Sequence, residues 1–245
     1  MPPRYIAPET LQAREEEILD SALEIISSHG VVALTMDKLV ANVSYSKGTV
    51  YNHFSSKEDV LAGLCNRNMK GVSELFSRAS AIDGCARDRM AAIGFAYMLS
   101  VLISPQHFAL VMNAKTEMFD KASEARREQH RVLDEHLFNI ICQVIDDAIE
   151  CGELMLSAGV DAQQVSFSLW AMAFGTIGLL LNGEKACSTT TGMMLENRVI
   201  AHGDMVMDGL GWAKSQRDIE GLLDYLKSDV FLQEIQWLQQ QGLCL

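Results

Sequence analysis

Side chains that can hydrogen-bond to a nucleic acid are concentrated between residues 35 and 57 of this 245-residue chain. Lysine, threonine, tyrosine and asparagine can reach base edges in a DNA groove, while helix-capping threonine, histidine and lysine can hold phosphates. The candidate DNA-binding residues are Thr35, Ser46, Lys47, Gly48, Thr49, Tyr51, Asn52, His53 and Lys57. We assign base edges to Lys47, Thr49, Tyr51 and Asn52. We assign phosphates to Thr35, His53 and Lys57.

Two short helical patterns must position these side chains. In the first, apolar residues recur at intervals of three and four behind Thr35, whose hydroxyl suits a helix N-cap. A polar turn over 43–45 follows. Ser46 can cap the second pattern, in which Val50 and Phe54 face inward. Such a pair of helices is a helix-turn-helix, whose second helix reads the major groove. Tyr51 could instead be a core aromatic residue.

The same stretch carries a recognisable family pattern: a first helix, T-x-x-x-I/L-A, a turn, S-x-G-T-L/V-Y-x-H/Y-F, and then S-K-E. The matching positions are Ile18, Ala22, Gly30, Thr35, Leu39, Val40, Ser46, Gly48, Thr49, Val50, Tyr51, His53, Phe54, Ser56, Lys57 and Glu58. Over residues 14–64 the chain therefore resembles the tetracycline-repressor (TetR) family of bacterial transcription regulators. Ser44 and Tyr45 depart from the pattern, which has Gly and a small aliphatic residue there. Serine resists positive φ, so the turn either avoids that region or is strained.

The charge of the chain is unusual for a DNA-binding protein. Its net charge is -12. Residues 1–60 hold five Lys or Arg against nine Asp or Glu, so no broad basic surface is expected and non-specific DNA affinity should be weak. Arg4 lies in a proline-containing tail, over 1–11, that we expect to be flexible. This arginine either reaches an adjacent groove or belongs to a disordered end.

The sequence after residue 56 predicts a second, larger helical domain. Few prolines and long 3.6-residue periodicity favour helices near 57–79, 86–103, 105–113, 119–151, 161–182, 192–213 and 217–240. The predicted fold is all-α, with a three-helix reader at the N-terminus. The domains expected are a tail over 1–11, the helix-turn-helix domain over 12–56, and an effector-binding and dimerisation domain over 57–245.

The run over 165–181 contains no charged residue and raises the question of a membrane span. We expect it to be too short and too interrupted for one, and to be buried on every side instead. Ala171, Gly175 and Gly178 place small residues on one face, where another helix can approach closely. Phe167 and its aromatic neighbours are expected to point into the domain. The resemblance implies that this helix and the next form a two-fold dimer that reads a palindromic DNA operator.

A ligand site is expected beside the helix predicted over 119–151. Its inward apolar stripe is interrupted by Gln129 and His136, and a polar group there needs a partner, either within the protein or on a ligand. Methionine and aromatic residues suit an adaptable, apolar site, although they fill ordinary cores equally well. The predicted ligand-binding residues are Met98, Phe108, Leu133, His136, Leu137 and Phe174. A small hydrophobic effector is therefore expected, and a strongly anionic one is less expected.

Other functional classes find little support in the sequence. The polar N-terminus predicts no signal peptide, and six cysteines at no paired spacing fit a cytoplasmic protein, with redox sensing by Cys142 and Cys151 as an alternative. His130 and Asp134 lack a third metal ligand, so we expect no metal and no cofactor. No nucleophile-and-base spacing indicates an enzyme. The prediction is a repressor that a small apolar effector releases from DNA. The alternative is a dimeric adaptor with a degenerate reader.

Overall fold

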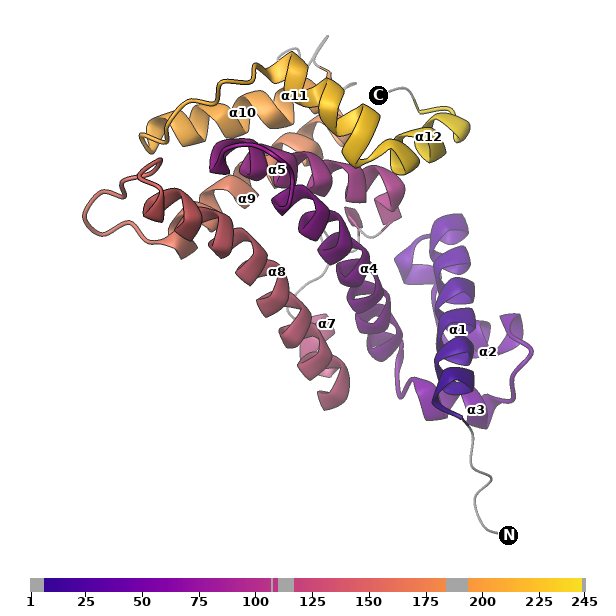
Figure 1. Cartoon of the computed structure of the whole chain (residues 1–245). Coiled ribbons are helices and arrows are strands. Elements are labelled where there is room, and N and C mark those ends of the chain that lie inside the picture. Colours follow the sequence, from indigo (N-terminus) through magenta and orange to yellow (C-terminus); the bar gives the residue numbers. More distant parts are fainter. Residues whose placement is uncertain (1–6, 107, 110–116, 184–193, 244–245) are drawn as a thin grey trace. The chain divides into compact units, whose positions relative to one another are not determined.

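The computed structural model describes residues 7–106, 108–109, 117–183 and 194–243 (Figure 1). Every regular element in this part of the chain is helical, which confirms the all-α prediction. The α-helices are α1 (Pro8–His29), α2 (Met36–Asn42), α3 (Lys47–His53), α4 (Lys57–Ser80), α5 (Ala86–Ile103), α7 (Glu117–Lys121), α8 (Glu124–Glu150), α9 (Ala162–Gly183), α10 (Leu195–Gly209), α11 (Ile219–Tyr225) and α12 (Leu232–Gln240). A 3-10 turn, η1 (Val31–Ala33), follows α1, and a π-helical turn, η3 (Leu226–Val230), follows α11.

The chain divides into two compact units, which differ from the domains expected. The N-terminal unit comprises residues 1–70 and 104–133, and the C-terminal unit comprises 71–103 and 134–245. Helices α4 and α8 each contribute residues to both units. The first turns of α4 belong to the N-terminal unit because Val60, Leu61 and Leu64 are buried in its core. A functional boundary after residue 56 stays a prediction.

The core of the N-terminal unit follows from the spacing of apolar residues. On α1, Ile18, Leu19 and Ala22 recur at helical intervals and are buried, and Val50 and Phe54 are fully buried beside them, as predicted. Helix α1 begins at Pro8, so the expected tail over 1–11 is too long. Proline suits the first turn of a helix, where its missing N–H costs nothing. Residues 1–6, which include Arg4, lie outside the described residues.

The C-terminal unit is built around α5, α9 and α10, with α9 packed against both of the others. Two predicted helices are interrupted in the structure. The pattern over 119–151 breaks at residues 122–123, since the Ser123 hydroxyl accepts a hydrogen bond from the Arg126 amide (3.4 Å) and starts α8 there. The pattern over 217–240 is broken by η3. The segments over 107, 110–116 and 184–193, where parts of other predicted helices fall, are outside the described residues.

Helix α9 differs from its prediction in length and in burial. The segment Ala162–Leu181 has 20 residues and a mean hydropathy of 1.5, so by length and composition alone it can cross a membrane. The expectation that it is too short is wrong because the helix begins at Ala162, three residues before the run over 165–181. Only 28% of that segment is buried within one chain, and Phe167 and Leu179 are exposed. Core helices of soluble proteins have the same length and composition, so these two properties do not identify α9 as a membrane span.

Candidate DNA interface and ligand cavity

Two hydroxyl caps fix the start of the helix-turn-helix elements. The Thr35 hydroxyl accepts a hydrogen bond from the Lys38 amide (3.3 Å), and the Ser46 hydroxyl accepts one from the Thr49 amide (3.2 Å). Both caps confirm the predicted helix starts. The Thr49 hydroxyl lies 2.9 Å from that of Ser46, so these two groups also satisfy each other within the protein.

One face of α3 is exposed and carries three of the four residues assigned to base edges, whereas the fourth, Thr49, is half-buried. Lys47, Gly48, Tyr51 and Asn52 are exposed, whereas Val50 is fully buried. The Lys47 ammonium lies 5.5 Å from the centre of the Tyr51 ring, so these two side chains form one continuous surface.

An acidic residue, Asp37, partly neutralises the positive charge of this face. The Lys47 ammonium also donates a hydrogen bond to the Asp37 carboxylate (3.1 Å). That hydrogen bond and the charge of Asp37 raise the pKa of Lys47, so the ammonium stays charged. A DNA contact by Lys47 would have to compete with this exposed ion pair, which is worth little in water.

Two residues assigned to phosphates are turned toward the protein. The His53 side chain is only 9% exposed, and its Nδ1 atom lies 3.8 Å from the Glu15 carboxylate. His53 follows Val50 by three positions and shares its inward side, so this orientation does not favour a phosphate contact, and the phosphate role of His53 stays a prediction. The Lys57 ammonium donates a hydrogen bond to the Val31 carbonyl oxygen (2.8 Å), which leaves two of its three N–H bonds for another partner.

The unusual turn residues have a structural explanation. None of the described non-glycine residues has a positive φ, so Ser44 avoids the region in which it would be strained. The Tyr45 hydroxyl donates a hydrogen bond to the Glu17 carboxylate of α1 (2.5 Å), and this bond raises the pKa of Tyr45. The Arg14 guanidinium lies 5.8 Å from the ring centre. Tyrosine at this position thus connects the turn to α1.

A buried carboxylate joins the start of α4 to the start of α8. One Asp59 oxygen accepts hydrogen bonds from the amide and hydroxyl of Ser55 (both 3.0 Å), and the other accepts from the Ser123 amide (3.0 Å) and hydroxyl (2.7 Å). Burial alone would raise the pKa of Asp59, but these four bonds outweigh it and hold the pKa below its ordinary value. We call this cluster of Ser55, Asp59 and Ser123 the Asp59 clamp.

A second set of contacts reinforces the same junction. The Arg126 guanidinium pairs with the Glu15 carboxylate (2.7 Å) and lies 4.8 Å from the centre of the Phe54 ring. The Asn66 amide group donates to the Arg126 carbonyl (3.1 Å) and to the Gln129 side chain (3.2 Å). Gln129, which interrupts the apolar stripe, therefore finds its partners within the protein.

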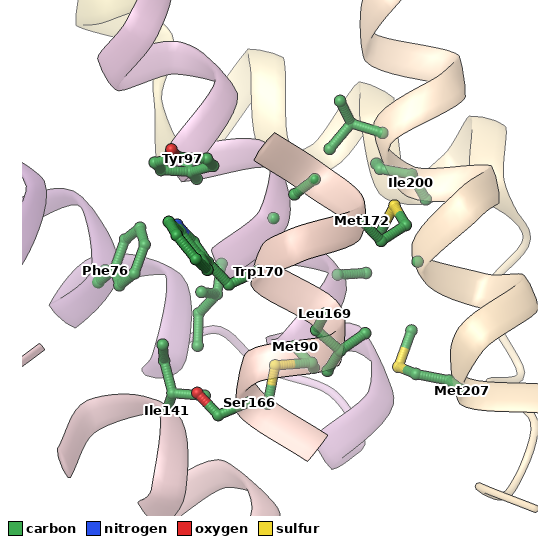
Figure 2. A pocket seen from close by; sticks show the side chains of 16 residues that line it. Phe76, Met90, Tyr97, Ile141, Ser166, Leu169, Trp170, Met172, Ile200 and Met207 are labelled. Atoms are coloured by element: carbon green, nitrogen blue, oxygen red, sulfur yellow. The ribbon is translucent and has the colours of Figure 1, made fainter. Parts of the chain in front are cut away.

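A small apolar cavity of about 60 Å³ lies inside the C-terminal unit (Figure 2). Its lining is Phe76, Met90, Ala91, Ile93, Gly94, Tyr97, Ile141, Ser166, Leu169, Trp170, Met172, Ala173, Val199, Ile200, Gly203 and Met207. Figure 2 shows the indole of Trp170 directed toward Phe76 and Tyr97. Burial raises the pKa of Tyr97 to about 12, although a hydrogen bond with Trp170 opposes this shift, so its hydroxyl is neutral at pH 7. This inner cavity therefore offers a ligand almost only apolar contact.

A larger cleft of about 460 Å³ adjoins the inner cavity and shares five lining residues with it. The shared residues are Phe76, Tyr97, Ile141, Ser166 and Trp170. The cleft is otherwise lined by Val72, Asp134, Glu135, Leu137, Phe138, Gln163 and Phe167. The two spaces together offer an apolar interior and a more polar outer part.

The structure does not bring the six predicted ligand-binding residues together. None of them lines the inner cavity, and only Leu137 lines the cleft. His136 is exposed and does not line either space, so its assignment to an inward stripe is wrong. Met98 is fully buried in the core, while Phe108 and Leu133 belong to the N-terminal unit. The sixth residue, Phe174, contacts the ring of Trp170, with ring centres 5.3 Å apart, but does not line either space.

The small residues of α9 lie on a face that a single chain leaves open. Ala171 is exposed, and Gly175 and Gly178 are half-buried. A Cβ atom added at Gly175 would have no heavy atom within 4 Å. The exposed Phe167 side chain lies on the same side, so the expectation that it points into the domain is wrong. In the described part of the chain, no group of three or more His, Cys, Asp or Glu side chains is placed to hold a metal ion.

Comparison with known proteins relates this architecture to one family. Residues 18–64 match the family described as bacterial regulatory proteins, tetR family. A fatty acid metabolism regulator protein of Bacillus subtilis is 26% identical over 161 residues, which cover 66% of this chain and 78% of that protein.

Solved structures agree on the fold. The regulator FadR of Bacillus subtilis in complex with stearoyl-CoA superposes with a TM-score of 0.58 at 16% identity, covering 80% of this chain and 96% of that one. The fatty acid degradation regulator FadR of Bacillus halodurans gives a TM-score of 0.61 at 13% identity, covering 85% of this chain and all of that one (100%). At these identities the likeness establishes the fold alone.

Proposed function

We propose that this chain, which belongs to the TetR family of bacterial transcription regulators, is a cytoplasmic homodimeric repressor that an apolar effector releases from a palindromic DNA operator. The observation that carries the proposal is the exposed face of α3, where Lys47 and Tyr51 lie side by side on a helix whose other side is buried. An exposed recognition helix with lysine, tyrosine and asparagine is suited to base edges.

The ligand cavity and the reader are connected through two continuous helices. Phe76 of α4 and Ile141 of α8 line the inner cavity. Asp59, in the first turn of α4, bonds in the Asp59 clamp to Ser123, which directly precedes α8. An effector that displaces Phe76 or Ile141 would therefore shift the helices that hold the reader. DNA must then weaken effector binding by the same factor as the effector weakens DNA binding.

The proposed dimer uses α9 and α10. The α9 face around Ala171 and Gly175 is open, and Leu179 and Met205 are exposed apolar side chains on these two helices. A second copy of the chain would cover them. Two α3 helices must then sit one helical turn of DNA apart, about 34–36 Å, or a multiple of it, to contact both half-sites of a palindrome.

An operator-binding experiment tests this function. A DNA sequence selected from genomic fragments is titrated with wild-type protein and with Lys47→Ala and Tyr51→Ala in a fluorescence anisotropy assay. We expect each substitution to cost about 1 to 3 kcal/mol, or about five- to 150-fold in affinity, with relaxed specificity at one base pair. Lys70→Ala, which removes an exposed lysine of α4, is the matched control and should bind like wild type.

The competing function is a dimeric adaptor with a degenerate reader, which the acidic charge of the chain favours. An adaptor would select no sequence from the genomic pool. It would also show the same weak DNA binding with or without Lys47 and Tyr51. Either result would replace the repressor proposal with the adaptor.

A further inference from the structure

The charged residues at the cleft are all acidic. Among the described residues that line either the cleft or the inner cavity, Asp134 and Glu135 are the only charged side chains, and Glu135 also interacts within the protein. Both lie on α8, and both are exposed. A ligand that enters the cleft therefore meets carboxylates near solvent before it reaches the apolar interior.

Cations that would balance an anionic ligand are either absent or already paired. Residues 134–150 of α8 and 162–183 of α9 contain no Lys or Arg. The parts of α4 and α5 in the C-terminal unit contain three arginines. Arg78 pairs with Glu234, Arg87 with Asp204 and Asp208, and Arg89 with Asp147. A phosphate or carboxylate group in the cleft would thus find every arginine within residues 71–103, 134–150 and 162–183 already paired.

Aromatic rings surround the same space. The cleft is lined by five aromatic side chains, which are Phe76, Tyr97, Phe138, Phe167 and Trp170. The faces of aromatic rings attract cations, most strongly those of tryptophan, and quaternary ammonium groups are recognised in this way. Rings and carboxylates together give a surface that attracts a positive charge and tolerates an apolar body.

We propose that the effector is a lipophilic cation, a quaternary or protonated amine attached to an apolar body. The apolar body enters the inner cavity among Met90, Leu169 and Met207, and the cationic group stays in the cleft near Asp134. The proposal rests on the proposed function for the regulatory role of the ligand, but binding itself does not depend on DNA. It separates this chain from the Bacillus subtilis FadR structure, which holds stearoyl-CoA, an anionic ligand.

The test compares ligands that share one alkyl chain and differ in charge. Decyltrimethylammonium, 1-decanol, decanoate and, in addition, stearoyl-CoA are titrated below their micellar concentrations, with calorimetry and tryptophan fluorescence as readouts. We expect the ammonium to bind about five- to tenfold more tightly than the alcohol, because it adds a cation–π contact and a carboxylate neighbour. Both anions should bind more weakly than the alcohol.

Matched variants assign the selectivity to the cleft. In the double variant Asp134→Asn with Glu135→Gln, we expect ammonium affinity to fall about threefold or more while the affinity for the alcohol stays unchanged. Asp146→Asn removes an exposed carboxylate of α8 that does not line the cleft, and it should leave both affinities unchanged.

Three results would overturn the proposal. The first is tighter binding of decanoate or stearoyl-CoA than of the ammonium. The second is an equal loss for the ammonium and the alcohol in the double variant, and the third is no binding of the ammonium at all. Operator binding by the same samples, measured without ligand, is unaffected by these outcomes. Failure of the ligand class is therefore distinguishable from failure of the repressor function.

Discussion

Replacing Asp59 by asparagine should destabilise the N-terminal unit, by an amount that follows from the geometry of the Asp59 clamp. Each carboxylate oxygen accepts one backbone amide and one hydroxyl. In Asp59→Asn an NH2 group replaces one of these oxygens and faces two donors. The hydroxyl can rotate to accept, but the backbone N–H of either Ser55 or Ser123 is left without an acceptor.

The expected cost is about 2 to 4 kcal/mol. A buried polar group without a partner costs about 1 to 3 kcal/mol, and the remaining bonds lose the strength that a charged acceptor gives them. Urea unfolding followed by circular dichroism measures this loss. Hydrogen exchange of the peptides containing Ser55 and Ser123 reports whether it is local to the clamp. Glu24→Gln, at an exposed carboxylate of α1, is the matched control and should change stability by less than about 0.5 kcal/mol.

The pH dependence of stability provides an independent check on the clamp. The pKa of Asp59 is lower in the folded protein than its ordinary value, so the unfolded chain takes up this proton first as the pH falls. The stabilisation is complete above the unfolded pKa of about 4 and is lost as the pH falls through the lower folded pKa. Asp59→Asn should therefore flatten the acid limb of the stability curve. An unchanged acid limb, or a stability loss below about 0.5 kcal/mol, would refute this account of the clamp.

Three further substitutions and one labelling experiment have defined outcomes. Gly175→Leu should weaken the dimer by about 1 to 3 kcal/mol, because the larger side chain would overpack the proposed contact between the two copies. The helical spectrum should stay intact, because the side chain meets open space within one chain. An unchanged mass in light scattering at micromolar protein would exclude this interface. His136→Phe should leave the effector response unaltered, since His136 is exposed away from both cavities, and a changed dose–response curve would contradict that placement. Tyr45→Phe should lower operator affinity in anisotropy assays by loosening the turn from α1, and equal affinity would show that the bond to Glu17 is dispensable. Iodoacetamide at pH 8 should label Cys65 and Cys142 slowly, as followed by mass spectrometry. Burial raises the pKa of Cys65 to about 12, and burial together with the charges of Asp146 and Asp161 raises the pKa of Cys142. Rapid labelling of Cys142 would support redox sensing by this residue.

Local patterns in the sequence were sufficient to predict the helix-turn-helix. The caps at Thr35 and Ser46 and the burial of Val50 and Phe54 depend on residues within four positions of each other. The inward orientation of His53 needed a partner on α1, Glu15, which is far away in sequence. Likewise, no short-range signal links Asp59 to Ser123, whose separation is 64 residues.

The cavity-facing side of α8 was mispredicted because hydropathy identifies burial rather than ligand access. The residues that line the cleft on this helix are Asp134, Glu135, Leu137, Phe138 and Ile141, and two of them are charged. An apolar-stripe argument discards charged positions and selected the exposed His136 instead. Where a cavity opens to solvent, its outer lining need not be apolar. The apolar stripe of α8 therefore does not include every residue that lines the cleft.

The distribution of charge can reconcile an acidic chain with a DNA-binding role. On the proposed reader, Lys47 faces outward on α3, and Glu15 and Glu17 are held by Arg126 and Tyr45. Those two carboxylates of α1 are thereby engaged within the protein, although the ion pair of Lys47 with Asp37 keeps one acidic group beside the reader. Few phosphates would be neutralised by such a surface, so the dependence of log affinity on log salt should be shallow. Specificity would then rest on the geometry of two α3 helices rather than on charge, which makes operator binding sensitive to any ligand that moves α4 or α8.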